Sequence, residues 1–378
     1  MSNKKTPRVT GNETTNSIPC YEIPYFGWVT DLFELAHTRN KGNPNTGAKP
    51  PRGWSLLKSK KPGAAVLASN TNRNGIYYAL EFPLIGGAWA FPKLSDCLFL
   101  IVLFDRWRWA EKEVKTLSDI PNEICVPLSE LRAIGPNSRA DHKAIETARA
   151  AVKMLSQIQI YESSTPFEEG KAPGNRPYTL FSDCYSRKKN IFVSVSETFL
   201  KALDRGWTAA KNRRYGGRLI AYIPRQIMNI DPRMRKAILA AVILSIRYSM
   251  NSKTRNRYSL DKLKSALLFG PDRHWLTPGE TGRPHETIHQ ILDALSMADL
   301  IGSFEFTGAN PADSLPDPRR IKNGNLAFTI PAIDDTKRIR TEQKAERKKK
   351  LKQAYRGPVF FLCQIPFTPD IDHKKALI

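Results

Sequence analysis

Residues 283–301 read RPHETIHQILDALSMADLI, and the apolar side chains of this stretch recur at intervals of three and four residues. They are Ile288, Ile291, Leu292, Leu295 and Ala298. This spacing predicts an amphipathic helix that buries one stripe of side chains in a core. The polar side of the same helix carries Glu286, Thr287, Gln290 and Asp293, with His289 beside it. That polar side is left to face solvent or a partner.

Two further helices are predicted before this stretch and two strands after it. Residues 234–250 are apolar nearly all round, which predicts a buried helix. Residues 259–270 combine a serine N-cap signal with a leucine stripe and end at Gly-Pro, which predicts a second helix. Residues 303–306 and 325–331 have short β-like patterns and are joined by a polar loop. The order helix, helix, helix, hairpin resembles a winged helix-turn-helix domain, which we expect over residues 190–332.

The third predicted helix resembles the recognition helix of winged helix-turn-helix proteins. From Thr287 to Leu295 its residues follow the alternation of polar and apolar positions usual in that superfamily, and they lead out through Leu300 and Ile301. One departure is Asp299, where many members have glycine. The departure bears on where the helix ends and leaves its register unchanged.

This helix suits the major groove of duplex DNA, which admits one α-helix. Arg283 and Gln290 are the best candidates for base-edge contacts, because Arg pairs with guanine and Gln with adenine. Thr287 and the free N–H groups at the helix start suit a phosphate. Glu286 and His289 complete the DNA-facing side. A surface helix that binds no ligand is the alternative.

Cations flank the predicted recognition helix, which is not itself basic. From residue 201 to residue 275 the chain has seventeen Lys and Arg against four Asp. The cations expected to contact phosphates are Lys253, Arg255 and Arg257 before the second helix, and Arg319, Arg320 and Lys322 in the loop of the hairpin. Such a division suits DNA binding, because phosphate contacts position a protein and base contacts specify the sequence. Taken singly, each cation is also explained as a solvated surface charge.

A weaker copy of the same pattern precedes this domain. Residues 127–135, PLSELRAIG, resemble the second helix, and the run KAIETARAAVKMLSQIQIYE at 143–162 resembles the third. We expect a first winged-helix-like domain over residues 76–165. The exposed side of its longer helix carries Lys143, Glu146, Arg149 and Lys153. DNA contact, a dimer contact and a plain core helix are all open for that helix.

The remaining segments complete an α+β fold class with two winged helix-turn-helix domains in tandem. Residues 1–75 are expected to be mostly disordered or loop, since much of this region is rich in Gly, Pro, Asn and Lys. Residues 166–189 fall in a Pro-, Gly- and Glu-rich stretch that we take as the linker. Residues 333–378 form a basic C-terminal segment, in which 336–356 is either a helix that contacts phosphates or a flexible arm.

Composition favours a polyanionic partner and a reducing compartment. Lys and Arg outnumber Asp and Glu by 59 to 36 in 378 residues, a formal net charge of +23, so nucleic acid is the first candidate partner and an anionic membrane surface the second. No apolar run approaches the ~20 residues of a membrane span, and the polar N-terminus lacks a signal-peptide pattern. The five cysteines stand apart with no CxxC pair. We expect a cytoplasmic protein without a metal or cofactor.

Two winged helices in tandem, the lead-in FVSVSETFLKAL at 192–203 and the basic charge together resemble plasmid replication initiator (Rep) proteins of the theta type. The resemblance covers roughly residues 120–332 and lies in architecture and hydrophobic pattern. It implies sequence-specific binding to repeats in a replication origin, with both winged helices engaged or the C-terminal one dominant. It also implies host replication proteins as partners and a homodimer that represses its own promoter.

Other functions find weaker support in the sequence. A winged-helix transcriptional regulator is the main alternative, but it requires a ligand-binding or dimerisation domain that the first 165 residues do not reveal. Residues 285–289 spell HExxH, the zinc metalloprotease motif, yet Pro284 places it in the first helical turn and no third ligand follows at familiar spacing. There is no GxxxxGK[ST] phosphate-binding loop and no paired His of a rolling-circle nickase. We therefore expect no enzymatic activity.

Overall fold

The computed structural model describes residues 20–24, 26–37, 49–51, 53–71, 75–113, 122–131, 141–202, 220–250, 257–267, 287–307 and 325–354. The fold is mixed α+β, as predicted. The chain divides into one unit that extends to Asp334 and a second that begins at Asp335. Among the described residues, no helix is both long and apolar enough to cross a membrane.

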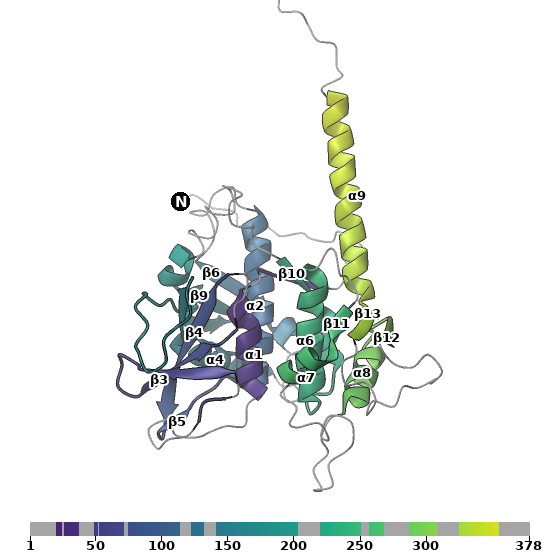
Figure 1. Cartoon of the computed structure of the whole chain (residues 1–378). Coiled ribbons are helices and arrows are strands. Elements are labelled where there is room, and N and C mark those ends of the chain that lie inside the picture. The colour runs from purple at the N-terminus through teal and green to yellow at the C-terminus, as the bar shows by residue number, and fades with distance from the viewer. Residues whose placement is uncertain are drawn as a thin grey trace, which may run out of the picture. The chain divides into compact units, whose positions relative to one another are not determined.

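Two helices and a strand form the centre of the first half of the chain (Figure 1). They are β1 (Cys20–Pro24), α1 (Gly27–His37) and α2 (Leu94–Glu113). Residues 97–105 of α2 are all buried, so this helix has no solvent-facing side along that stretch. The run from residue 97 to residue 104 is fully apolar and has no periodicity, so its sequence is consistent with a buried helix or a buried strand.

An antiparallel sheet of five strands covers this centre. Its strands are β2 (Trp54–Leu57), β3 (Ala64–Ser69), β4 (Tyr77–Ile85), β5 (Ala88–Trp89) and β7 (Gln159–Ser163). β4 is central, pairing with β3, β7 and β5. Alternate residues of the strands serve two separate clusters, because successive side chains point to opposite faces of a sheet. Leu67 and Leu80 join the main core, whereas Val66 and Ala79 pack with Tyr161 in a smaller cluster on the other face.

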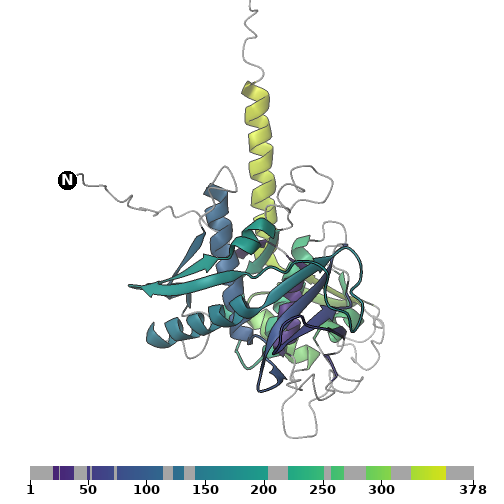
Figure 2. The same cartoon turned by 90° about the vertical axis from the view of Figure 1, so that its left-hand side faces the viewer.

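An array of six elements follows in the order helix, strand, short helix, helix, strand, strand, and β7 of the five-stranded sheet is inserted between its last helix and its hairpin. After α2 it contains β6 (Glu123–Pro127), α3 (Leu128–Leu131), α4 (Asp141–Gln157), β8 (Phe181–Arg187) and β9 (Asn190–Val195). The three strands form an antiparallel sheet in the order β6-β9-β8. We call these elements the first array. Figure 2 shows the β8–β9 hairpin, in teal, extending beside α4.

The second half of the chain repeats this order. The second array contains α6 (Arg235–Met250), β11 (Arg257–Ser259), α7 (Leu260–Ala266), α8 (Ile288–Met297), β12 (Ser303–Thr307) and β13 (Asn325–Thr329). Its strands are ordered β11-β13-β12, so in both arrays the second strand of the hairpin pairs with the single strand. The predicted helices and strands of this half are confirmed, with ends that differ by a few residues.

Three elements lie outside the arrays in the second half of the chain. β10 (Ile220–Pro224) pairs with β1 and so joins the two halves of the chain. The short 3-10 helix η3 (Arg225–Asn229) links β10 to α6. The long helix α9 (Pro331–Ala354) follows β13 directly. The described part of the basic C-terminal segment is therefore a helix and not a flexible arm.

The structure differs from the predicted boundaries in the first half. Within residues 1–75, predicted as mostly disordered or loop, β1, α1, β2 and β3 are ordered elements, because Trp28, Leu32 and Phe33 are buried, β1 pairs with β10, and β2 and β3 pair with each other. β8 begins at Phe181, inside the predicted 166–189 linker, and β9 opens the region assigned to the second domain. Both strands instead pair with β6 of the first array. Residues 159–162, predicted as the end of a helix, instead belong to β7 at the edge of the five-stranded sheet.

Candidate nucleic-acid interface

The helix predicted to contact bases begins at a capping box. Thr287 is the N-cap of α8: its hydroxyl accepts the backbone N–H of Gln290 at 3.3 Å, and the side-chain Oε1 of Gln290 accepts the backbone N–H of Thr287 at 2.9 Å. Two of the free N–H groups at the helix start are satisfied in this way. Helix α8 therefore begins at Ile288, five residues after the predicted start at 283. The Thr287 side chain is buried and acts here as a cap.

This cap limits what Gln290 can offer to a base. Gln290 is exposed, but its one carbonyl oxygen is already engaged with Thr287. Its side-chain NH2 retains two donor hydrogens. Bidentate pairing with adenine needs both the oxygen and the NH2 group, so it would require the capping box to open. With the cap intact, Gln290 is a donor suited to guanine N7 and O6 or to thymine O4.

The two faces of α8 differ as the sequence predicts. The apolar stripe Ile288, Ile291, Leu292, Leu295 and Ala298 is buried in the main core. Gln290, Asp293 and Ser296 are exposed on the other side, and Met297 is 88% exposed. Helix α8 packs against α6, so its polar side is presented to solvent.

The C-terminus of α8 ends where the recognition-helix pattern usually has glycine. Asp299 has φ +53°, the left-handed conformation that favours glycine. The backbone N–H of Leu300 donates to the carbonyl of Leu295 at 2.9 Å, and the N–H of Asp299 donates to Ser296 at 3.0 Å. This pair of bonds is a Schellman motif, with Leu300 and Leu295 both buried beside it. The backbone turn that usually contains glycine is therefore present here, and Asp299 adopts its left-handed conformation at a steric cost.

Asp299→Gly is expected to raise the free energy of unfolding by about 0.5–1 kcal/mol, because glycine adopts positive φ without the steric cost borne by other residues. Asp299→Ala is the matched control and is expected to lower it, since alanine lacks the short polar side chain that eases this conformation. Urea unfolding of the three proteins measures both changes. Stabilisation by alanine as well as glycine would contradict the role given to the backbone.

The other predicted DNA contacts are placed only in part. Seven of them lie outside the described residues, namely Arg283, Glu286, Lys253, Arg255, Arg319, Arg320 and Lys322. His289 is the second residue of α8, and Arg257 opens β11 opposite Ala327 of β13. His285 of the HExxH pattern also lies outside the described residues. The structure thus brings together Thr287 and Gln290 of the predicted set.

The first array has a basic surface on α4. Its buried side is Ala144, Ala148, Ala151, Val152 and Leu155, which leaves Lys143, Arg149 and Lys153 exposed on the opposite side with Glu146. The Nη2 of Arg149 donates to the hydroxyl of Ser186 in β8 at 2.6 Å. This bond fixes the middle of α4 beside the end of the β8–β9 hairpin.

The tip of that hairpin is basic, a feature that the sequence reasoning missed. Arg187 pairs with Asn190 across a two-residue turn formed by Lys188 and Lys189, and Lys188 has φ +54°. Arg187, Lys188 and Lys189 are all exposed. Because Ser186 bonds to Arg149, the hairpin tip continues the basic side of α4. We call Lys143, Arg149, Lys153, Arg187, Lys188 and Lys189 the α4–hairpin cations. The run RKKN between two alternating segments was the available signal.

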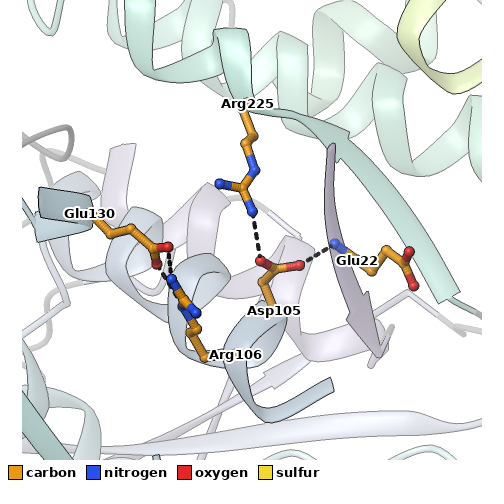
Figure 3. A network of polar contacts seen from close by, with 5 residues as sticks. All are labelled: Glu22, Asp105, Arg106, Glu130 and Arg225. Atoms are coloured by element: carbon orange, nitrogen blue, oxygen red, sulfur yellow. Dashed lines mark hydrogen bonds and ion pairs between the residues drawn. The ribbon is translucent and has the colours of Figure 1, made fainter. Parts of the chain in front are cut away.

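A polar network joins the two halves of the chain (Figure 3). Asp105 of α2, whose side chain is 1% exposed, accepts the backbone N–H of Glu22 in β1 at 2.7 Å and lies 3.3 Å from Nη2 of Arg225 in η3. Burial raises the pKa of Asp105, and the positive charge of Arg225 opposes this rise in part. The Arg225 guanidinium also lies 4.9 Å from the ring centroid of Tyr21.

The same network reaches the first array. Arg106, next to Asp105 on α2, forms two hydrogen bonds with the carboxylate of Glu130 in α3, one of them from Nε at 2.9 Å. Strand β1, helix α2, helix α3 and the start of the second half are therefore linked by charged groups as well as by the β1–β10 pairing. Such links hold the two arrays of this unit in one arrangement.

Comparison of the chain with models of protein families, with curated proteins and with solved structures found no match.

Proposed function

We propose that this protein is a sequence-specific duplex DNA-binding protein made of two winged helix-turn-helix domains in tandem. The observation that carries the proposal is the repeated array: three helices, with a hairpin attached to the core by one short strand, occur twice, and the order differs only by β7, which the first array has between its last helix and its hairpin. The sequence pattern of residues 190–332 predicts a helix-turn-helix core followed by a hairpin. The first array then spans α2 to β9, and the second spans α6 to β13.

In this proposal each array presents one helix to a major groove. For α8 the exposed side carries Gln290, which donates to a base edge while its oxygen caps the helix. For α4 the exposed side is basic, and the hairpin beside it supplies Arg187, Lys188 and Lys189 for the phosphates. Base contacts specify the site and phosphate contacts hold the protein in register.

The joined arrays favour repeated DNA sites. Strand pairing between β1 and β10 and the contact of Asp105 with Arg225 fix the separation of the two recognition helices within one chain. A protein of this kind is best matched by two half-sites at a set spacing. We propose that these sites are repeats in a plasmid replication origin, which the protein binds to initiate replication, with host replication proteins as further partners and a homodimer as a second state.

Selection from a random library of duplexes tests this function, followed by footprinting on the replicon that carries the gene. The expected result is enrichment of a bipartite sequence that recurs as repeats at one locus of that replicon. Protection at scattered promoters with none at such a locus would indicate a transcriptional regulator. Failure to enrich any sequence would reject base recognition altogether.

Gln290→Glu is expected to weaken binding to the selected site about tenfold while leaving stability nearly unchanged. Glutamate at this position retains the oxygen that accepts the Thr287 N–H, so the capping box persists. It removes the NH2 donor and adds a negative charge near the bases, and one good base contact is worth about 1–3 kcal/mol of discrimination.

Gln290→Ala is the matched comparison, because it removes the base donor and the cap together. It is expected to lose affinity and also about 0.5–1 kcal/mol of unfolding free energy. Binding isotherms and urea unfolding of both variants separate the two roles. Normal affinity and selectivity in Gln290→Glu would remove Gln290 from the DNA interface.

A further inference from the structure

Helix α9 leaves the first unit after an anchored first turn. Ile333 is fully buried, and Asp334 accepts the hydroxyl of Tyr248 at 2.5 Å. Residues 335–354 then form the described part of the second unit. They are rich in Lys, Arg, Glu, Gln and Ala, all strong helix formers. The composition of this part of α9 therefore favours a helix.

Local charge pairs support the same helix. Arg338 lies 3.7 Å from Asp335, and Lys350 lies 2.9 Å from Glu346, at spacings that place the partners on one side. Exposed pairs of this kind contribute little to stability. Nine Lys and Arg stand against three Asp and Glu from residue 335 to residue 354, an excess of six positive charges that these pairs do not neutralise.

The acidic positions of this helix gather on one side, where Arg338 and Lys350 pair with them. At about 100° per residue, the positions of Asp335, Glu342 and Glu346 fall within an arc of about 40°. On the opposite side an arc of about 140° collects six cationic positions and no acidic one. These positions are Lys337, Arg340, Lys344, Arg347, Lys348 and Lys352. We call them the cationic face of α9.

Chemistry favours nucleic acid over a membrane as the partner of this face. A helix that lies on a membrane needs an apolar side to bury among the lipids. In residues 335–354 the largest apolar side chains are Ile339 and Leu351, whose positions fall about 120° apart around the helix. Twenty helical residues span about 30 Å, close to one turn of duplex DNA at about 34 Å. A cationic face of this length matches a row of phosphates.

We propose that the cationic face of α9 binds the sugar–phosphate backbone of duplex DNA without regard to sequence, and so extends the contact made by the two arrays. The proposal deepens the function proposed above and rests on it for the identity of the DNA. Its physical content is counterion release: every phosphate neutralised adds about 0.9 to the slope of log affinity against log salt.

The test uses the full chain and a 40-bp duplex that lacks any selected site. The variant Lys337→Gln/Arg340→Gln/Lys348→Gln removes three charges from the cationic face. The control Arg338→Gln/Lys349→Gln/Lys350→Gln removes three charges elsewhere on the same helix, and glutamine preserves helix formation in both. At about 100 mM salt we expect the first variant to bind about tenfold more weakly, with a salt slope smaller by two to three. The control is expected to change affinity less than about threefold.

Equal losses in the two variants would overturn the proposal, because they would show that net charge and not the face matters. Unchanged binding in the first variant would overturn it as well. Vesicles rich in phosphatidylserine are the second probe: binding that the first variant abolishes on vesicles but not on duplex would assign the face to lipid. Because the duplex lacks a selected site, these outcomes are independent of base recognition by α8. If the library selection fails but the first variant still loses affinity for the duplex as expected, only base recognition by α8 is rejected.

Discussion

Arg225→Met is expected to lower the free energy of unfolding by about 2–3 kcal/mol. The substitution keeps a long apolar stem but removes the hydrogen bond from Arg225, so the buried carboxylate of Asp105 keeps the hydrogen bond from the Glu22 N–H without a positive charge beside it. Removing one partner of a buried ion pair costs about 3–5 kcal/mol. We expect less here because the Arg225 side chain is 43% exposed and solvent screens part of the interaction. Urea unfolding at neutral pH measures the loss.

A double-mutant cycle shows whether the loss comes from the unpaired charge. Asp105→Asn removes the carboxylate while keeping an oxygen for the Glu22 N–H. Combined with Arg225→Met, it is expected to recover about 1 kcal/mol relative to Arg225→Met alone, because no unpaired charge is left buried. Strictly additive losses in the double variant would mean that the two side chains do not interact.

The pH dependence of this loss has a definite sign. Burial raises the pKa of Asp105 above the ordinary value of 3.8, so the folded protein binds the proton more tightly than the unfolded chain does. Between these two pKa values the unfolding free energy contributed by Asp105 falls as pH rises. Without Arg225 the pKa rises further, so the deficit of Arg225→Met should shrink as pH is lowered toward 4. A deficit that grows on acidification would contradict this account.

The sequence predicted elements well where periodicity was strong. Helix α8 is the clearest case, because its stripe from Ile288 to Ala298 has one buried side. Its start was placed too early, although Thr287 and Gln290 already form the S/T-x-x-E/Q spacing of a capping box. Local patterns of this kind are visible in a sequence because the interacting residues are three or four positions apart.

Strand pairing explains the elements that the sequence did not reveal. Strands β2 and β3 lie in a Gly- and Pro-rich region, where they pair with each other as a hairpin, and β3 also pairs with β4. Strand β8 follows a linker-like stretch, and the hairpin it forms pairs with β6 more than fifty residues earlier. Such pairing is set by the tertiary core rather than by nearby residues. For the same reason the α4–hairpin cations, brought together by the contact of Arg149 with Ser186, were not predicted as one surface.

The hairpin tip should account for a large share of DNA affinity. Arg187→Gln/Lys188→Gln/Lys189→Gln is expected to weaken binding to the selected duplex on the order of hundredfold at about 100 mM salt, with a salt slope smaller by two to three. All three side chains are exposed at a turn, so folding stability should change little. The loss should exceed that from α9, because the bond between Ser186 and Arg149 holds this tip beside the other cations of α4.

A matched control removes the same number of charges from another turn. Lys58, Lys60 and Lys61 are exposed between β2 and β3, and Lys58→Gln/Lys60→Gln/Lys61→Gln changes the net charge equally. We expect the affinity of this control for the duplex to stay within about threefold of that of the unaltered protein. The loss of three of its 59 Lys and Arg residues changes the overall electrostatic attraction to DNA only slightly. Comparable losses in the two triple variants would assign binding to net charge and remove the hairpin from the interface.

Combining the hairpin variant with Gln290→Glu separates phosphate contacts from base contacts. The two sites lie in different arrays, so their free-energy losses should add to within about 0.5 kcal/mol. Only the hairpin change should lower the salt slope, whereas only the Gln290 change should alter which base is preferred at one position. A change of base preference caused by the hairpin variant would instead mean that the tip enters a groove, and the first array would then read sequence through its wing.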